Sequence, residues 1–258
     1  MLFLLSPAKS LDYETPPHIT RHSLPLFTPQ SAQLIDVLKT KTPQQISTLM
    51  KLSDTLSGLN AVRYQEWSPK FTGANSKQAV LAFNGNVYEG LNAQTLTDQQ
   101  LDWAQDHLCI LSGLYGVLRP LDWMQPYRLE MGTTLATPKG TNLYQFWDAQ
   151  ISDYLNTRAA ADTSPVIVNL ASQEYFKAVD RKALKVRVVS CVFQELRGNQ
   201  YKIISFNAKR ARGLMVRYAI EKQVTSVEKL QSFNAEGYCF EAAVSGPDEL
   251  VFRRKQVI

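Results

Sequence analysis

The chain alternates between short, continuous apolar runs and longer segments in which apolar residues recur every three or four positions. Runs of about four to eight residues predict buried strands, whereas the longer spacing predicts amphipathic helices. We expect strands at residues 2–5, 79–83, 108–111, 166–170, 187–195, 201–206, 237–240 and 250–253. We expect helices at residues 31–40, 43–52, 61–67, 98–107, 142–157, 172–177 and 208–224.

Capping and turn residues support several of these boundaries. Thr42 and Thr97 stand where helix N-caps are expected, and Pro43 occupies a first helical position. Residues 197–200, with the sequence Arg-Gly-Asn-Gln, predict a hairpin between two strands. Helices and strands are mixed along the whole length, with no repeat and no linker. The pattern therefore predicts an α/β (mixed α+β) fold in one compact domain spanning residues 1–258.

Composition places the chain among ordinary globular proteins, since 45% of its residues are hydrophobic and 20% are charged. Cys109, Cys191 and Cys239 are widely spaced and form no disulfide or zinc pattern, so we expect reduced thiols, no metal and no cofactor. The apolar run at the N-terminus is too short for a signal peptide, and no run approaches the roughly 18 residues of a membrane span. We expect a cytoplasmic protein without membrane contact.

Positive charge is concentrated in one part of the sequence. The formal net charge is +5, but twelve Lys and Arg residues against three acidic residues fall between Lys177 and Lys222. Such a density of cations favours a polyanionic partner, because phosphate attraction and counterion release increase with local positive charge. The alternative is a solvated face whose charges point in several directions.

The most basic local element opens the last long predicted helix. Lys209, Arg210 and Arg212 stand in its first turns, where positive charge opposes the helix dipole. A bound phosphate would relieve that conflict, so we expect these three residues to contact a phosphate.

A second candidate for phosphate binding lies between residues 50 and 67. We expect two helices joined by a Leu-Ser-Gly-Leu-Asn hairpin at residues 56–60, where Gly58 lets the backbone approach a partner closely. Arg63 and Lys70 would add charge beside it. The alternative is an ordinary connection between two helices, since a single glycine is a weak signal.

Polar residues also follow two of the predicted strands. Lys9 comes just after the first strand, and residues 169–175 bring Ser172 and Glu174 to the end of another. The mouth of a sheet is a common ligand position, where a lysine contacts phosphate or acts as a nucleophile. Lys9 with Glu130, Glu174 and Asp122 as acid and base candidates would suit a lyase or glycosylase acting on DNA or a nucleotide. The familiar catalytic signatures are otherwise missing.

Several long stretches together resemble the YaaA family of bacterial peroxide-stress proteins over nearly the whole chain. They are LLSPAKSLDYETP, TPQQISTLMKLSDTLSGLNAVRYQEW, LAFNGNVYEGL, LSGLYGVLRPLDWMQPYRLEMG, NLYQFWD, VIVNLASQEYFKAV, KIISFNAKRARGLMVRY and FNAEGY. The resemblance implies a family-specific compact fold with a basic cleft and a helix-hairpin-helix-like element. It also implies DNA binding without known enzymatic activity, in a response that limits unincorporated iron and oxidative DNA damage. The cleft would draw on Lys9, Arg63, Arg119, Arg128, Lys209, Arg210 and Arg212.

Three hypotheses follow. The first is binding of duplex or branched DNA mainly through phosphates, with Tyr115, Tyr127 or Trp123 stacking on an unpaired base. The second is the enzyme acting on DNA or a nucleotide. The third, direct binding of iron, is disfavoured because no tight cluster of His, Cys and carboxylates has ligand spacing. A small-molecule ligand in the same cleft stays open.

Overall fold

The computed structural model describes residues 1–160, 162 and 165–255. Its main sheet has the strand order β11-β12-β9-β8-β1-β5-β6, with β10 paired to β9. These strands are β1 (Leu2–Leu5), β5 (Leu108–Ser112), β6 (Gly116–Leu118), β8 (Val166–Asn169), β9 (Arg187–Arg197), β10 (Gln200–Lys202), β11 (Cys239–Phe240) and β12 (Glu249–Arg254). Two further ladders pair β2 (Ser10–Leu11) with β4 (Phe83–Asn84) and β3 (Lys77–Gln78) with β7 (Trp123–Met124).

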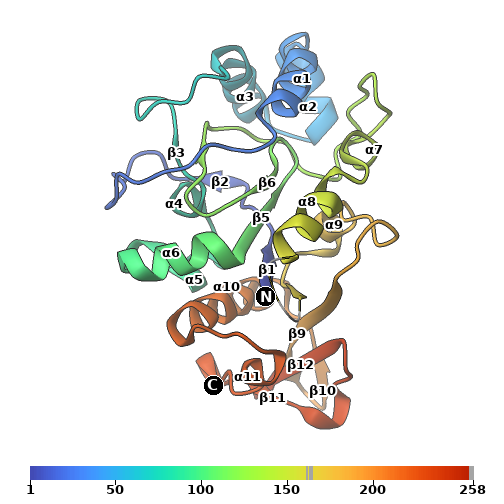
Figure 1. The fold of residues 1–258 in the computed structure, drawn as a ribbon. Coiled ribbons are helices and arrows are strands. Elements are labelled where there is room, and N and C mark those ends of the chain that lie inside the picture. Colours follow the sequence, from blue (N-terminus) through green and yellow to red (C-terminus); the bar gives the residue numbers. More distant parts are fainter. Residues whose placement is uncertain (161, 163–164, 256–258) are drawn as a thin grey trace.

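Helices cover both faces of this sheet. In Figure 1, α5, α6 and α10 lie on one side of the central strands, α8 and α9 lie on the other, and α1, α2 and α3 gather at the top of the view. Their bounds are α1 (Thr28–Lys39), α2 (Pro43–Met50), α3 (Asp54–Glu66), α4 (Ala79–Ala82), α5 (Asn86–Leu91), α6 (Asp98–His107), α7 (Leu143–Trp147), α8 (Gln150–Ala159), α9 (Gln173–Phe176), α10 (Ser205–Lys222) and α11 (Val227–Leu230). Within the described residues, no helix combines the length and apolarity that a membrane crossing requires.

The order of strands reverses beside β1. The chain first adds β5 on one side of β1 and later adds β8 on the other, and both pairings are parallel. In a parallel sheet the crevice at such a reversal opens at the carboxyl ends of the strands and is the usual place for a ligand. Ser6, which follows β1, and Leu170, which follows β8, therefore stand at the predicted mouth of the sheet.

The mixed α/β prediction is confirmed, and the continuous apolar runs explain why. All four residues of β1 are buried, as expected for a central strand with a parallel neighbour on each side and helices over both faces. Residues 108–112 and 166–169 repeat this pattern, whereas β9 alternates buried and partly exposed positions for much of its length.

The predicted hairpin at residues 56–60 is wrong. These residues lie inside α3, which the Ser53 side chain caps by accepting a hydrogen bond from the Leu56 amide. Gly58 is therefore a helix-interior residue, and a Cβ there would meet no atom within 4 Å. The connection between α2 and α3 is residues 51–53, where Lys51 takes the left-handed conformation that ends α2. Gly58 cannot supply the flexible turn that the hairpin required.

Several other boundaries differ from the prediction, and three of the differences change the type or continuity of an element. Residues 79–82 form the single turn α4 instead of a strand, because this buried apolar run lies between two short ladders. The helix expected at residues 142–157 is broken at Asp148, which has a φ of 45°. The strand expected at residues 201–206 stops at Lys202 because α10 starts at Ser205. Lys209, Arg210 and Arg212 consequently stand beyond the first turn of α10, where the conflict with the helix dipole is weaker.

Candidate functional site

Two adjoining pockets lie along the segment that follows β1. Residues 6–10 line one pocket, which we call the Arg212 pocket and which has a volume of about 400 Å³. Residues 11–15 line the other, which we call the Arg63 pocket and which has a volume of about 700 Å³. Asn84 lines both. The antiparallel pairing of β2 with β4 places this residue opposite Ser10, at the boundary between the two pockets.

The Arg212 pocket opens at the reversal point of the sheet. Ser6 follows β1 and Ser172 follows β8, and the Ser172 amide donates a hydrogen bond of 2.8 Å to the Ser6 hydroxyl oxygen. The Tyr88 hydroxyl donates to the Ser6 carbonyl at 3.0 Å, which ties α5 to the same loop. Three elements that are distant in the sequence therefore meet at the floor of this pocket.

Two carboxylates face the pocket, and both have protein partners. Glu130 Oε1 lies 2.6 Å from Lys9 Nζ, and its other oxygen lies 3.3 Å from an Nη of Arg128. Glu174 accepts a hydrogen bond of 2.9 Å from the Gly132 amide and has no ion pair among the described residues. Three of the four candidates for the enzyme hypothesis, Lys9, Glu130 and Glu174, thus lie around one pocket, whereas Asp122 is buried elsewhere and paired with Arg119.

The cations of α10 point in two directions. Lys209 and Arg212 line the pocket, whereas Arg210 forms an ion pair of 2.7 Å with Glu236 elsewhere. Across residues 1–160, 162 and 165–255, no carboxylate pairs with Arg212, and its buried Nε has no hydrogen-bond partner. Burial lowers the pKa of Arg212, because removing a guanidinium from water disfavours its charged form.

A close helix crossing fixes where Arg212 lies. Gly213 of α10 rests on α5, and a Cβ at that position would overlap the backbone oxygen of Val87. Gly90 of α5 makes the reciprocal approach, where a Cβ would overlap the backbone oxygen of Arg210. Only glycine permits two helix backbones to approach so closely. The crossing therefore holds Arg212 beside residues 84–87 at the rim of the pocket.

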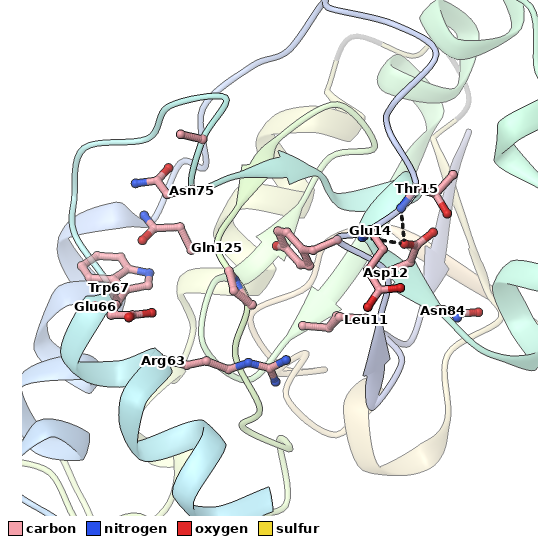
Figure 2. A pocket seen from close by; sticks show the side chains of 13 residues that line it. Leu11, Asp12, Glu14, Thr15, Arg63, Glu66, Trp67, Asn75, Asn84 and Gln125 are labelled. Atoms are coloured by element: carbon pink, nitrogen blue, oxygen red, sulfur yellow. Dashed lines mark hydrogen bonds between the residues drawn. The ribbon is translucent and has the colours of Figure 1, made fainter.

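The Arg63 pocket lies between α3 and residues 11–15. Figure 2 shows the Arg63 side chain extending from α3 into the pocket, with Glu66 and Trp67 further along the chain and Asp12 and Glu14 on the opposite wall. Its closest polar contact is the Asn60 side-chain oxygen at 3.5 Å, and no ion pair engages it within the described chain. Burial lowers the pKa of Arg63, as it does for Arg212.

A buried lysine fixes the wall that carries Asp12. Lys77 Nζ donates to the carbonyl oxygens of Asp12 and Thr15 at 2.8 and 2.7 Å and lies 3.5 Å from the Asp12 carboxylate. Burial lowers the pKa of Lys77, and the Asp12 charge offsets part of that change. This contact was not predicted from the sequence, because Lys77 is far from residue 12 along the chain and only the fold brings them together.

The two pockets differ in charge. Acidic residues outnumber the single arginine in the Arg63 pocket, whereas the Arg212 pocket has three cations, Lys9, Lys209 and Arg212, against two carboxylates. The lining does not form a uniformly basic cleft. Positive charge is concentrated in the Arg212 pocket.

The remaining sequence-predicted cations lie outside the pockets. Arg119 donates to the buried Asp122 carboxylate through its backbone amide, Nε and Nη, so its charge is compensated within the protein. Arg128 is compensated by Glu130. Lys70 is exposed on the loop after α3, and Gly58 is inside α3.

The predicted stacking residues also differ from expectation. Tyr115 and Tyr127 are buried and hydrogen-bonded in the core, so neither presents its ring to a ligand, and that prediction is wrong. Trp123 stacks on His22 with ring centroids 3.4 Å apart. Phe206, which the sequence analysis missed, is 61% exposed and lies one helical turn before Lys209. Its place at the polar start of α10, among basic residues, was the available signal.

No metal centre is formed by the part of the chain that the structure describes: it contains no group of three or more His, Cys, Asp and Glu side chains with a suitable arrangement.

Comparison with known proteins places these features in a family. A family model described as "Peroxide stress protein YaaA" matches residues 1–244. The chain belongs to the YaaA family. Among its relatives, proteins of Polaromonas sp. and Albidiferax ferrireducens are 77% and 68% identical over 99% of both chains. A Bordetella pertussis relative is 64% identical over 99% of this chain and 100% of its own. All three are called UPF0246 proteins.

Proposed function

We propose that this YaaA-family protein binds duplex or branched DNA through phosphate contacts and thereby serves the peroxide stress response. The supporting observation is a set of cations without carboxylate partners along the adjoining pockets. Arg63, Lys209 and Arg212 have no ion pair among the described residues, whereas Arg119, Arg128 and Arg210 are each held by a carboxylate. Unpaired cations are the ones that gain most from a phosphate.

The exposed ring of Phe206 supports the same proposal. It lies beside the basic surface of α10, where an unpaired base would stack on it while the backbone contacts Lys209. Base–aromatic stacking contributes about 1–3 kcal/mol per base and depends little on sequence. This arrangement favours DNA with unpaired or branched regions over perfect duplex.

The test is a fluorescence anisotropy titration of duplex and branched DNA, all with 5′-hydroxyl ends, across a salt series. For the wild type, log K falls by about 0.9 per phosphate contact for each decade of salt. In Arg63→Gln/Lys209→Gln the slope becomes shallower by about two contacts. The control, Lys182→Gln/Lys222→Gln, removes two exposed charges that line neither pocket and keeps the wild-type slope. Absence of DNA binding by the wild type, or identical slopes in both variants, contradicts the proposal.

The link to iron is proposed through the bound DNA. A protein that covers phosphates competes with Fe(II), which otherwise associates with the DNA backbone. We expect the wild type to slow nicking of plasmid by Fe(II) and peroxide, and Arg63→Gln/Lys209→Gln to slow it less. Protection that is equal in both would mean that any effect on iron is independent of DNA binding.

A second candidate is an enzyme acting on DNA or a nucleotide, favoured by the ion pair between Lys9 and Glu130 at the Arg212 pocket. A lyase requires an amine nucleophile, which Lys9 would supply, and Glu130 lies beside it as the acid–base candidate. Borohydride trapping with abasic DNA tests this. A covalent adduct in the wild type that is lost in Lys9→Gln supports the enzyme, and no adduct in either rejects it.

A further inference from the structure

Arg212 is a partly buried cation in its pocket that no carboxylate pairs with among the described residues. Charges largely removed from water are normally paired, since leaving them unpaired destabilises the folded protein. Arg212 has neither an ion pair nor a partner for its buried Nε within the described residues, although Arg210, two positions earlier, has a full partner in Glu236. The close crossing of Gly213 on α5 holds this part of α10 against the pocket rim. An anion from outside the protein is the partner that this geometry lacks.

The other polar groups of the pocket suit a particular anion. Lys209 is a second cation on the same helix, and Lys9 is a third, with its ammonium on Glu130. Two or three cations lining one pocket fit the two charges and three oxygens of a phosphate monoester. Glu174 also lines the pocket, where its Oε1 accepts from the Gly132 amide; it has no cation partner among the described residues, so its carboxylate can accept from a hydroxyl.

Size and location point to a small molecule or a chain end. A volume of about 400 Å³ lies at the lower end of the range for pockets that enclose one small ligand. The pocket also opens at the reversal point of the parallel sheet, between β1 and β8. A nucleotide has both the phosphate for Arg212 and the sugar hydroxyls for Glu174.

We propose that the Arg212 pocket binds one phosphate monoester group of a nucleotide, with Arg212 and Lys209 as its cationic ligands and Glu174 as acceptor for a sugar hydroxyl. The nucleotide is either free or the 5′-phosphorylated end of a DNA strand. Only the free nucleotide offers Glu174 a hydroxyl, because the terminal sugar of a DNA strand has no 2′-hydroxyl and its 3′-oxygen is esterified, so a strand end would use the phosphate contacts alone. This site goes beyond the proposed contacts with internal phosphates, because it requires a terminal phosphate that intact duplex lacks.

The test is calorimetric titration of the full chain, without DNA, with AMP, with inorganic phosphate and with adenosine. We expect AMP to bind with a Kd of about 1 mM or tighter, phosphate to bind more weakly, and adenosine not to bind. Arg212→Gln weakens AMP binding at least about tenfold. Arg212→Lys, which keeps the charge but loses the planar donor fork, also weakens it. Lys222→Gln, at the exposed far end of α10, binds AMP as the wild type does.

A second measurement separates a lost site from a lost fold. Because the unpaired Arg212 charge costs stability, Arg212→Gln is expected to melt at the wild-type temperature or above it. AMP raises the Tm of the wild type but not of Arg212→Gln. The proposal is overturned if adenosine binds as tightly as AMP, if Arg212→Gln binds AMP like the wild type, or if AMP and phosphate both fail to bind.

Oligonucleotides identify the source of the phosphate. A 5′-phosphorylated single strand that binds more tightly than AMP, and more tightly than the same strand with a 5′-hydroxyl, assigns the site to DNA ends. Tighter binding of AMP assigns it to free nucleotides, and both results support the pocket. Failure of the proposed DNA function appears separately, because that test uses DNA without a terminal phosphate.

Discussion

Residues of one type have different roles in this protein, and their partners decide which. Arg119 is held by Asp122, whose side chain is only 1% exposed, whereas Arg212 has no ion pair among the described residues although two carboxylates line its pocket. The prediction put Arg119 and Arg212 in one basic cleft, because a sequence shows the charge of each residue but not which carboxylate pairs with it. Asp122 is only three positions from Arg119, yet Glu236 is 26 positions from Arg210. Which cations are available for a ligand is therefore a property of the fold.

The cysteines give a prediction at the same scale. Burial raises the pKa of Cys109 and of Cys191 to about 12, so both are protonated thiols at neutral pH and react slowly with peroxide. Cys239 is exposed. We expect a thiol reagent such as DTNB at pH 7.5 to modify Cys239 rapidly in the native protein and the other two only after unfolding in urea. Rapid modification of three thiols in the native state would contradict these positions.

At the scale of the element, the contact between α5 and α10 depends on two glycines. Gly213 and Gly90 let the two backbones meet, and this contact sets the rim of the Arg212 pocket. Gly58 has the opposite environment, with open space around the position of its missing Cβ inside α3. Gly213 and Gly58 look alike in the sequence, but only Gly213 is required by packing.

Alanine substitutions at Gly213 and at Gly58 should therefore change the free energy of unfolding in opposite directions. Gly213→Ala forces a methyl group against the Val87 carbonyl and is expected to lower the free energy of unfolding by about 1–3 kcal/mol or more. Gly58→Ala is expected to raise it by about 0.5–1 kcal/mol, since alanine loses less entropy in a helix interior. Urea unfolding of both variants measures this. A loss of stability in Gly58→Ala would mean that residues 56–60 are not helical.

Elements were predicted from the sequence wherever apolar spacing and caps agreed. The continuous runs of β1, β5 and β8 and the threonine caps of α2 and α6 gave correct positions. The single helix at residues 142–157 failed because its apolar spacing continues through Asp148, where the backbone turns. Five residues of the Arg212 pocket were each predicted as site residues, but not as members of one pocket: Lys9, Glu130, Glu174, Lys209 and Arg212. Asn84 and Lys77 were not, because their importance comes from pairing with residues far away in the chain.

At the scale of the whole molecule, one buried carboxylate links three parts of the C-terminal half. Glu195 of β9 accepts hydrogen bonds from Arg254 of β12 at 2.7 Å and from Tyr238 at 3.0 Å. Burial alone would raise the pKa of Glu195, but these hydrogen bonds and one from Asn207 hold it below its usual value. A lowered pKa means that folding favours the ionised form.

This linkage predicts how stability depends on pH. The contribution of Glu195 is complete above its unfolded pKa of about 4.3 and is lost as the pH falls through the lower folded value. Glu195→Gln should lower the free energy of unfolding by about 1.5–3 kcal/mol at pH 7, and by less at pH 3. Glu249→Gln, an exposed change in β12, is the control and should leave stability nearly unchanged. Equal losses for Glu195→Gln at both pH values would contradict the pKa direction.

The place of β1 in the sheet has a consequence for synthesis on the ribosome. This strand is translated before both of its neighbours, which are β5, beginning at Leu108, and β8, beginning at Val166. The four apolar residues of β1 therefore have no strand partner until more than a hundred further residues have been synthesised. Such a segment is a natural substrate for chaperones that act on nascent chains. The pocket is completed only when Arg212 has been translated, so binding activity should appear late in synthesis.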